Sequence, residues 1–507
     1  MHYHIIHRLS HGSRGAGGAI EKDRFSNVYG LAAVGKNCMT IGSDEFSLLT
    51  LTEIADKIKS GSVSSLTVTE AQLRRIARLD PDLYAYAQVM ETSALEQAKA
   101  ADKEIAAGGH RGPLHGVPIA VKDLCWIEGV PTRAGTLVHG NFVPGEDATV
   151  VRRLRQAGAI IVGKTQMTEG AYSDYHPAIT PSVNPWHADY WAGISSSGSA
   201  VATAAGLCFG AIASDTGGSI RWPAAANGVT GLKPTWGRVS RHGVFDLAPS
   251  LDHIGTIARS AMDAGILLAA IAGSDPKDPT AAAQAVPDFA SASPSSIGGL
   301  RIGFDPRWNS EDVEPQTQAA LAAASDVFTA LGAHMVEIRF PDVSQAVADW
   351  VPNCAVEAAA VHERDFAANR DLYGPILAGV IEMGKAVSEA EYQQILLRRT
   401  IFRRDVEAQF ASVDMILTPV QPFAPLTLAT IATLGEQPDL IARLQRYTCP
   451  LDMSGHPALT FPAGIARDGM PIGLQLLAGQ FQELTLVRAG AAFQGHTAWH
   501  KRHPGKG

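Results

Sequence analysis

The sequence predicts an α/β fold in which a large mixed, mostly parallel β-sheet is covered by helices on both faces. Three short apolar runs bounded by turn residues indicate buried strands: VPIAVKDL from Val117, AIIVGKT from Ala159 and GAIASDT from Gly210. Residues 148–157 and 200–205 lie between these runs and are typical of helices. Strands that alternate with helices in this way indicate a sheet with helices on both of its faces.

Three helices are expected before the first of these strands. The first two carry Thr-x-x-Glu capping boxes, at Thr50–Glu53 and Thr67–Glu70. Gly61 is expected to end the first helix, and Asp80-Pro81 the second. The third helix is expected over residues 93–107, which are rich in Ala and Glu and are followed by two glycines.

The second half of the chain resumes the pattern after a break. Residues 274–299 are rich in Pro, Ala and Ser, which predicts a surface excursion rather than a second core. Residues 315–411 are expected to be mostly helical. Further strands are expected at LRIGFD, VDMILTP, PALTFPAG and IGLQLLAG. We therefore expect a single domain over residues 46–500, followed by a tail over 501–507.

The first 45 residues do not fit this pattern. They begin MHYHIIHRLSHGSRGAGG, are rich in His, Arg and Gly, and lack the apolar core of a secretory signal. We interpret residues 1–45 as a disordered leader or a mis-assigned start, with Met39 as the candidate true start. A cleaved transit peptide is the weaker alternative, because the segment has little amphipathic period.

The composition excludes several classes of protein. The 507 residues are 46% hydrophobic and 18% charged, with a net charge of −8 and no basic cluster, so nucleic acid is not an expected ligand. No run of 18 apolar residues exists, so no membrane-spanning helix is expected. The cysteines are scattered and odd in number, which argues against a disulfide framework or a zinc site and favours the reducing cytoplasm. They are Cys38, Cys125, Cys208, Cys354 and Cys449.

A lysine at the end of an apolar run is the first candidate for chemistry. Lys122 follows Ile119-Ala120-Val121. On its own, such a lysine usually keeps its ammonium group in water. If it is instead buried beside hydroxyl groups, it loses its proton readily and acts as a base.

Two segments rich in serine and glycine follow. Residues 191–200 read WAGISSSGSA, and residues 215–221 read DTGGSIR. Glycine beside serine lets backbone N–H groups crowd around a hydroxyl, as a serine nucleophile with an oxyanion hole requires. The simpler alternatives are a flexible linker or phosphate loop for the first segment, and a capped strand-to-helix turn for the second. The GxxxxGK[ST] pattern of a phosphate loop is absent.

In this order and spacing, AVKD, ISSSGSA and SDTGGSIRWPAAANGVTGLKPTWGRVSRHG resemble the amidase signature family of serine hydrolases. The resemblance extends from about residue 51 to about residue 494 and implies a Ser-Ser-Lys triad without a catalytic histidine. It implies Lys122 as the base, Ser195 as a bridging serine that follows a cis peptide bond, and Ser219 as the nucleophile. The two serines lie 24 positions apart (219 − 195 = 24), as in the family.

The serine-rich loop departs from the family pattern of two glycines, two serines and two glycines. Ile194 and Ser197 each replace a glycine. The bridging serine is kept, although the departures change what is expected of the loop geometry. Ser196 is the neighbour with which Ser195 could be confused, and the spacing to Ser219 favours Ser195.

The DTGGSIR segment supplies the expected oxyanion hole and its support. Asp215 and Arg221 are expected to pair and hold the loop. Each well-placed donor in an oxyanion hole is worth roughly 3–4 kcal/mol of transition-state stabilisation. The expected donors are the backbone N–H groups of Thr216, Gly217, Gly218 and Ser219.

Histidines and metals are not expected to take part. A Ser-His-Asp hydrolase would require a GxSxG elbow, which residues 197–199 do not supply in the right frame. No HExxH or similar ligand pattern is present. The histidines near the motifs are therefore interpreted as surface residues or as residues behind the site. They are His115, His176, His187, His242 and His253.

Aromatic residues cluster before the serine-rich loop. Ordinary packing is the simpler interpretation, and a collar around the substrate is the alternative. The cluster comprises Tyr172, Tyr175, His176, Trp186, Tyr190 and Trp191. The candidate substrate-binding residues are Tyr172, Tyr175, Trp191, Gly193 and Ile194.

The resemblance implies a cofactor-independent amidase that cleaves the C–N bond of a small carboxylic amide through an acyl-enzyme. Aryl amides, esters and carbamates are candidate substrates as well. One alternative is the glutaminase subunit of a tRNA-dependent amidotransferase, which shares the motifs. Another is a non-catalytic binding protein on the same fold, against which the retained Lys122, Ser195 and Ser219 argue. A homodimer is expected only from the family.

Overall fold

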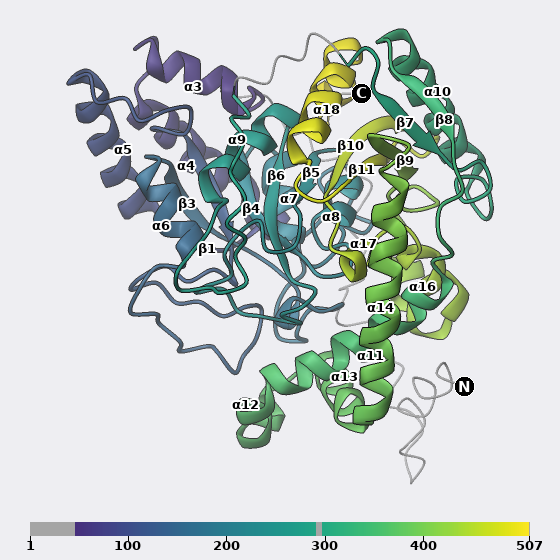
Figure 1. Ribbon diagram of the computed structural model, residues 1–507. Helices are drawn as coiled ribbons and strands as arrows, with labels where there is room; N and C mark the ends of the chain where they lie inside the picture. The colour runs from purple at the N-terminus through teal and green to yellow at the C-terminus, as the bar shows by residue number, and fades with distance from the viewer. Residues whose placement is uncertain (1–45, 291–296, 506–507) are drawn as a thin grey trace.

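A single 11-stranded sheet forms the centre of the structure, a computed structural model that describes residues 46–290 and 297–505 (Figure 1). The strand order is β1-β3-β2-β4-β6-β5-β10-β11-β9-β7-β8. The expected leader over residues 1–45, with Met39, lies outside the described residues, as do the last two residues of the expected tail. The single domain over residues 46–500 stays a prediction.

The strands of the described residues are β1 Tyr86–Val89, β2 Pro118–Lys122, β3 Ile160–Thr165, β4 Gly210–Asp215, β5 Thr230–Lys233, β6 His253–Ala258, β7 Arg301–Phe304, β8 His334–Glu337, β9 Met415–Pro419, β10 Ala458–Ile465 and β11 Pro471–Ala478. The helices are α3 Leu51–Lys59, α4 Ser65–Leu83, α5 Glu91–Ala106, α6 Thr149–Gln156, α7 Ser197–Ala204, α8 Arg221–Asn227, α9 Ala261–Ile271, α10 Pro315–Ala330, α11 Ser344–Val361, α12 Glu363–Ala368, α13 Pro375–Ala386, α14 Glu389–Gln409, α15 Leu428–Ala432, α16 Pro438–Gln445, α17 Cys449–Ser454 and α18 Glu483–His496.

The mixed α/β sheet is confirmed, but the expectation that it is mostly parallel is wrong. Within the described residues, β2–β3, β2–β4, β7–β8 and β7–β9 are the four parallel pairings, and the six others are antiparallel. Only the parallel pairs need long crossover connections, whereas β10 and β11 are joined by a short turn over residues 466–470. The sequence patterns revealed the buried strands but not their directions.

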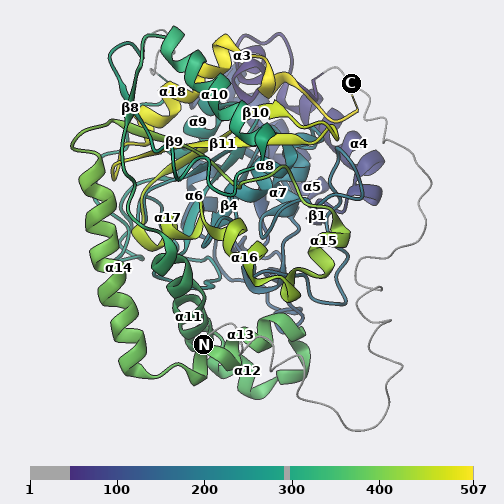
Figure 2. The same cartoon turned by 90° about the vertical axis from the view of Figure 1, so that its right-hand side faces the viewer.

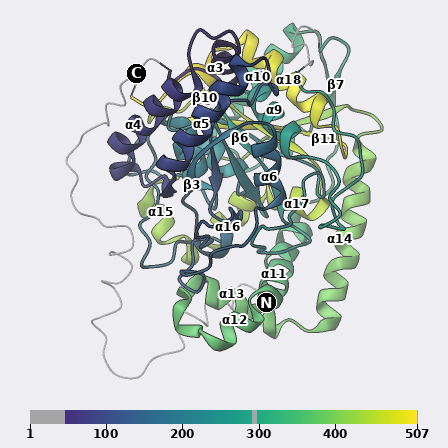
Figure 3. The same ribbon diagram turned by 90° about the vertical axis from the view of Figure 1, so that its left-hand side faces the viewer.

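Helices cover both faces of the sheet, as expected (Figures 2 and 3). Alternate residues of β2 divide between the faces. Ile119 and Val121 join the core beneath α6 and α9, whereas Ala120 packs with α4, α5 and α7. Lys122 is in step with Ala120, so its side chain lies on the face where α7 begins.

The ends of the N-terminal helices agree only in part with the expectations. The capping box of Thr50 and Glu53 at α3 is present. The cap of α4 is Ser64 rather than Thr67, because the Ser64 side chain accepts a hydrogen bond from the Thr67 N–H group. Pro81 does not end α4 but lies within its last turn, and α4 extends to Leu83.

Helices α11 to α14 extend beyond one end of the sheet in all three views, and they confirm a mostly helical segment over residues 315–411 (Figures 1, 2 and 3). Only β8 interrupts the helices of that segment. Residues 274–290, the described part of the expected surface excursion, contain neither a helix nor a strand, although Phe289 is buried. None of the helices in the described residues is long and apolar enough to cross a membrane.

Candidate active site

Lys122 ends β2 and is fully buried. Its Nζ atom lies 2.7 Å from the Oγ atom of Ser195. It also lies 2.8 Å from the Oγ atom of Ser196 and 2.8 Å from that of Ser214. The buried amine is therefore surrounded by three hydroxyl groups.

Burial in this setting lowers the pKa of Lys122 from 10.5 to about 7. Hydroxyl groups solvate a charged ammonium poorly compared with water or a carboxylate, so the neutral amine is favoured. Lys164, near the end of the neighbouring strand β3, differs from Lys122 in its partner: its Nζ atom lies 2.8 Å from the carboxylate oxygen Oδ1 of Asp123. That buried ion pair gives Asp123 a structural role.

The serine-rich loop brings Ser195 to this lysine. The peptide bond between Ile194 and Ser195 is cis, as the resemblance implies. Gly193 has φ +77°, and a Cβ atom on it would lie 2.4 Å from Pro223 Cα, so the position requires glycine. Ser197, which replaces a glycine of the family pattern, is the first residue of α7.

The turn after β4 brings Ser219 to the same loop. The Ser196 N–H group donates to the Ser219 carbonyl oxygen at 3.3 Å. Ser219 itself is 7% exposed, so a small molecule would have to reach it through a narrow opening. Within the described part of the chain, hydrogen bonds join Lys122 to Ser195 but do not join the hydroxyls of Ser195 and Ser219.

The expected oxyanion hole needs one correction. The Gly218 N–H group donates to Asp215 Oδ1 at 2.7 Å, so it does not face a substrate. The N–H groups of Thr216, Gly217 and Ser219 donate to no other described residue. Three of the four expected donors therefore remain, because the fourth holds the turn in place.

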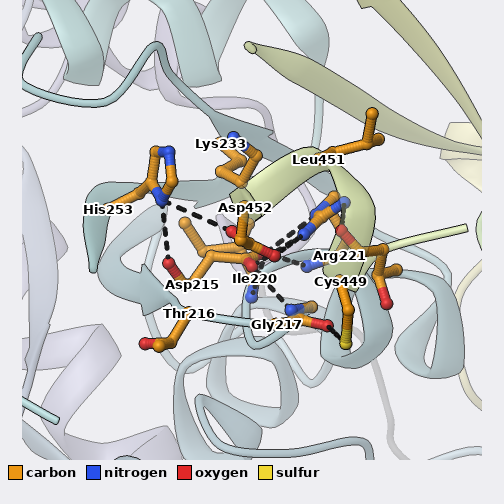
Figure 4. A network of polar contacts seen from close by, with 12 residues as sticks. Asp215, Thr216, Gly217, Ile220, Arg221, Lys233, His253, Cys449, Leu451 and Asp452 are labelled. Atoms are coloured by element: carbon orange, nitrogen blue, oxygen red, sulfur yellow. Dashed lines mark hydrogen bonds and ion pairs between the residues drawn. The ribbon is translucent and has the colours of Figure 1, made fainter. Parts of the chain in front are cut away.

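Asp215 and Arg221 pair as expected, within a larger buried network (Figure 4). Arg221 Nη2 donates to Asp215 Oδ1 at 2.9 Å and to Asp452 Oδ2 at 2.6 Å. Burial alone would raise the pKa of Asp215, but the adjacent guanidinium of Arg221 holds it well below its usual range. Burial, together with the neighbouring Asp215 carboxylate, raises the pKa of Asp452 well above its usual range.

Two further titratable groups complete this network. His253 lies beside Asp452 at 3.4 Å and is fully buried, and burial lowers its pKa well below the usual range. Burial also lowers the pKa of Lys233 to about 8. His253 thus lies behind the site rather than at the surface. His115 and His176 are buried as well, whereas His187 is exposed and His242 is partly exposed.

Sequence reasoning missed two residues that hold the Gly217 turn. Trp350 of α11 donates from Nε1 to the Thr216 carbonyl oxygen at 2.8 Å, and a Cβ atom on Gly217 would lie 2.4 Å from its ring. Cys449 Sγ lies 3.2 Å from the Gly217 carbonyl oxygen. Both are more than 130 positions away along the chain, and no local pattern identifies them.

The candidate substrate-binding residues divide into two groups. Tyr172 is partly exposed and stacks on Trp350, with ring centroids 6.5 Å apart, so it lies beside the Gly217 turn. Tyr175 and Trp191 are buried. The Tyr175 hydroxyl bonds Ser197 Oγ, which favours packing and loop support for this residue. Gly193 and Ile194 lie within the loop itself.

Comparison with known proteins agrees with this geometry. A family model described as Amidase matches residues 67–487. A protein of Mycobacterium tuberculosis named "Putative amidase AmiD" is 49% identical over 465 residues, which cover 92% of this chain and 97% of that protein. One subunit of the glutamyl-tRNA(Gln) amidotransferase of Geobacter metallireducens is 37% identical over 483 residues, which cover 90% and 99% of the two chains. The solved peptide amidase of Stenotrophomonas maltophilia has a TM-score of 0.77 at 30% identity and covers 92% and 99%.

Together with these comparisons, a buried lysine among serine hydroxyls on a mixed sheet indicates an amide-hydrolysing class of enzyme. The chain belongs to the amidase family. In the described residues, no group of three or more His, Cys, Asp or Glu side chains is arranged to hold a metal ion.

Proposed function

We propose that the protein cleaves the C–N bond of a small carboxylic amide, with Ser219 as nucleophile, Ser195 as proton bridge and Lys122 as base. The observation that carries the proposal is the distance of 2.7 Å between Lys122 Nζ and Ser195 Oγ in a fully buried setting. A base with a pKa near neutrality takes a proton and returns it readily. The family membership gives independent support.

The hydrogen bonds around Lys122 support a proton route through Ser195. A neutral amine has two N–H donors and one lone pair, so one of its three hydroxyl neighbours must donate to it. Ser196 cannot do so, because its hydroxyl donates to the Ser214 carbonyl oxygen at 3.0 Å. Ser195 and Ser214 can both donate, and of these two Ser195 belongs to the loop that meets Ser219.

We propose the following reaction on this arrangement. Ser219 Oγ attacks the amide carbon and forms the new C–O bond, while its proton passes to Ser195 and the Ser195 proton passes to Lys122. The N–H groups of Thr216, Gly217 and Ser219 stabilise the oxyanion. Lys122 returns a proton through Ser195 to the departing amine as the C–N bond breaks, and water then cleaves the acyl-enzyme by the same relay.

A second candidate function is that of a glutaminase within a tRNA-dependent amidotransferase. The 37% identity to the amidotransferase chain favours it, but the 49% identity to the protein named as an amidase favours the first function. We further propose a cytoplasmic location, which the four buried free thiols of the described residues support. A homodimer remains an expectation that gel filtration with light scattering would test.

The test is ammonia and amine release by the purified chain from aryl amides, alkyl amides, carbamates and glutamine. We expect turnover of at least one member of the panel, and its loss by a factor of about 10³ or more in Ser219→Ala. Ser199→Ala is the matched control, because Ser199 lies on α7 and bonds Thr165 instead of the relay. Full activity of Ser219→Ala would contradict the proposal. Activity on glutamine alone would favour the second candidate.

A further inference from the structure

A cavity of about 90 Å³ lies beyond the ends of β2 and β3. Its walls include Leu124, Met167 and Ala171. Leu124 is two residues after Lys122, and Met167 precedes Thr168, whose N–H group donates to the Ser195 carbonyl oxygen at 3.3 Å. Two residues of extended chain span at most about 7 Å, so the backbone that carries the proton relay also forms part of the cavity wall, although Lys122, Ser195 and Ser219 do not line it themselves.

The third wall residue connects the cavity to the oxyanion turn. Ala171 precedes Tyr172, which stacks on Trp350, and Trp350 bonds the Thr216 carbonyl oxygen. Ligands of sheets of this kind bind beyond the carboxyl ends of parallel strands, where this cavity lies. A substrate attacked by Ser219 can therefore place one of its groups in the cavity.

His362 supplies an unsatisfied polar atom to this cavity. It lies between α11 and α12, is 4% exposed, and lines the cavity. Its Nε2 atom has no hydrogen-bond partner among the described residues. A Cβ atom on Gly170, another wall residue, would lie 3.5 Å from that nitrogen. A buried polar atom without a partner is costly, so a water or a ligand group within the cavity must supply one for Nε2.

The tautomer of His362 follows from its other nitrogen. Nδ1 lies 3.1 Å from the hydroxyl of Tyr373, a residue that is 5% exposed and whose hydroxyl has no other hydrogen-bond partner among the described residues. The phenol hydrogen needs an acceptor, so it points at Nδ1, and the ring hydrogen of the neutral histidine is then on Nε2. Burial lowers the pKa of His362 to about 4, so the ring is neutral at pH 7. The cavity therefore receives an N–H donor.

Two aspartate side chains at the rim of the cavity can accept hydrogen bonds. Asp246 and Asp365 both line it, with side chains 34% and 27% exposed. Asp246 is bound by Arg241, and Asp365 by the exposed Arg364. Two carboxylates disfavour a third from a substrate and accept hydrogen bonds from an N–H group. With a volume of about 90 Å³, the cavity suits a small polar group and not a bulky one.

We propose that this cavity binds a second, uncleaved neutral amide group of the substrate, whose carbonyl accepts from His362 Nε2 and whose N–H groups face Asp246 and Asp365. The inference rests on the proposed function and names its substrate class: small diamides. His362 is then a specificity-determining residue that contacts the substrate away from the reacting atoms.

The test compares three amides of the same shape: succinamide, succinamate and 4-methylpentanamide. We expect wild-type kcat/KM for succinamide to exceed that for each of the other two by roughly tenfold or more. His362→Phe should bring kcat/KM for succinamide to within about threefold of that for 4-methylpentanamide. Only kcat/KM for succinamide should fall. Tyr373→Phe removes the hydroxyl that fixes the ring hydrogen of His362 on Nε2, so it should reduce the preference for succinamide in part. His115→Phe is the control, because His115 is buried beside Glu104, away from the cavity.

Equal turnover of succinamide and 4-methylpentanamide by the wild type would overturn the proposal, and so would an unchanged preference in His362→Phe. Cleavage of none of the three overturns it as well. In that case Ser219-dependent turnover of other amides would leave the proposed function standing. Conversely, undiminished turnover in Ser219→Ala would contradict Ser219 as the nucleophile, whichever of the three amides is preferred.

Discussion

Two fully buried cations lie within the candidate active site, and their partners differ. Among the described residues, Lys122 forms hydrogen bonds with three hydroxyl groups and with no carboxylate, and burial lowers its pKa to about 7. Arg221 lies between the carboxylates of Asp215 and Asp452, and its pKa is raised despite burial. The same degree of burial thus gives one group that exchanges a proton near neutrality and one that never does.

The difference assigns separate tasks to the two regions. A proton relay needs a group that changes charge at working pH, and hydroxyl neighbours allow that. A turn that presents N–H groups needs a fixed frame, and a paired guanidinium with five directed donors supplies one. We therefore expect changes around Lys122 to affect the rate, and changes around Arg221 to affect the fold.

The largest expected effect is that of Lys122→Met on the rate. Removal of the proposed base should lower kcat/KM by roughly 10³–10⁴-fold or more. The chain should stay folded, because methionine fills similar space without a charge. Kinetics on a cleaved amide, together with circular dichroism, would check both parts. Retained activity in a folded variant would contradict the assignment of the base.

Lys164→Met is the matched control for that experiment. It removes a lysine from the neighbouring strand but leaves Asp123 buried without its cation. Breaking a buried ion pair costs about 3–5 kcal/mol of stability. The thermal midpoint should therefore fall much further than in Lys122→Met, while the folded fraction keeps most of its activity. The opposite pattern would show that the two lysines have been assigned the wrong way round.

Arg221→Met should have the next largest effect, on stability. It leaves the carboxylates of Asp215 and Asp452 buried together without a cation, at a cost of about 3–5 kcal/mol. Denaturant unfolding followed by fluorescence would measure the loss. Asp452→Asn is the comparison, since Arg221 keeps Asp215 and the amide keeps an oxygen acceptor, so its loss should be clearly smaller. Equal losses would mean that charge pairing does not hold this frame.

The sequence indicated the contact between Lys122 and Ser195 better than the contacts that surround Arg221, for a physical reason. Lys122, Ser195 and Ser219 belong to short motifs whose order along the chain is itself the signal. The partner of Arg221 in α17 is 231 positions away and has no motif of its own. Contacts of that range depend on which helix packs against which turn, and no local pattern encodes this.

The fold shows the same division. Apolar runs such as those of β2, β3 and β4 were predicted because both faces of these strands are buried. Strand β5, TGLK, was missed because Leu232 is its single large apolar residue, so it forms no apolar run. Strand directions also escaped prediction, since side-chain burial is alike in parallel and antiparallel neighbours.

The smallest expected effect is the dependence of the rate on pH, and it separates the two regions most finely. If Lys122 is the base, its neutral form is required, so kcat/KM should rise about tenfold per pH unit below pH 7 and level off above it. Burial raises the pKa of Glu169 to about 7 as well, so Glu169→Gln is the control and should leave the midpoint of the pH–rate profile in place.

The pH dependence of stability provides a second measurement. Between pH 7 and the ordinary lysine pKa of 10.5, the unfolded chain holds a proton on Lys122 that the folded chain lacks, so Lys122 makes the free energy of unfolding rise with pH. Lys122→Met should remove that contribution, whereas Arg221→Met should leave it, because a paired guanidinium does not titrate in this range. If Glu169→Gln instead shifts the midpoint of the pH–rate profile, the group that titrates would be the Glu169 carboxyl group and not Lys122.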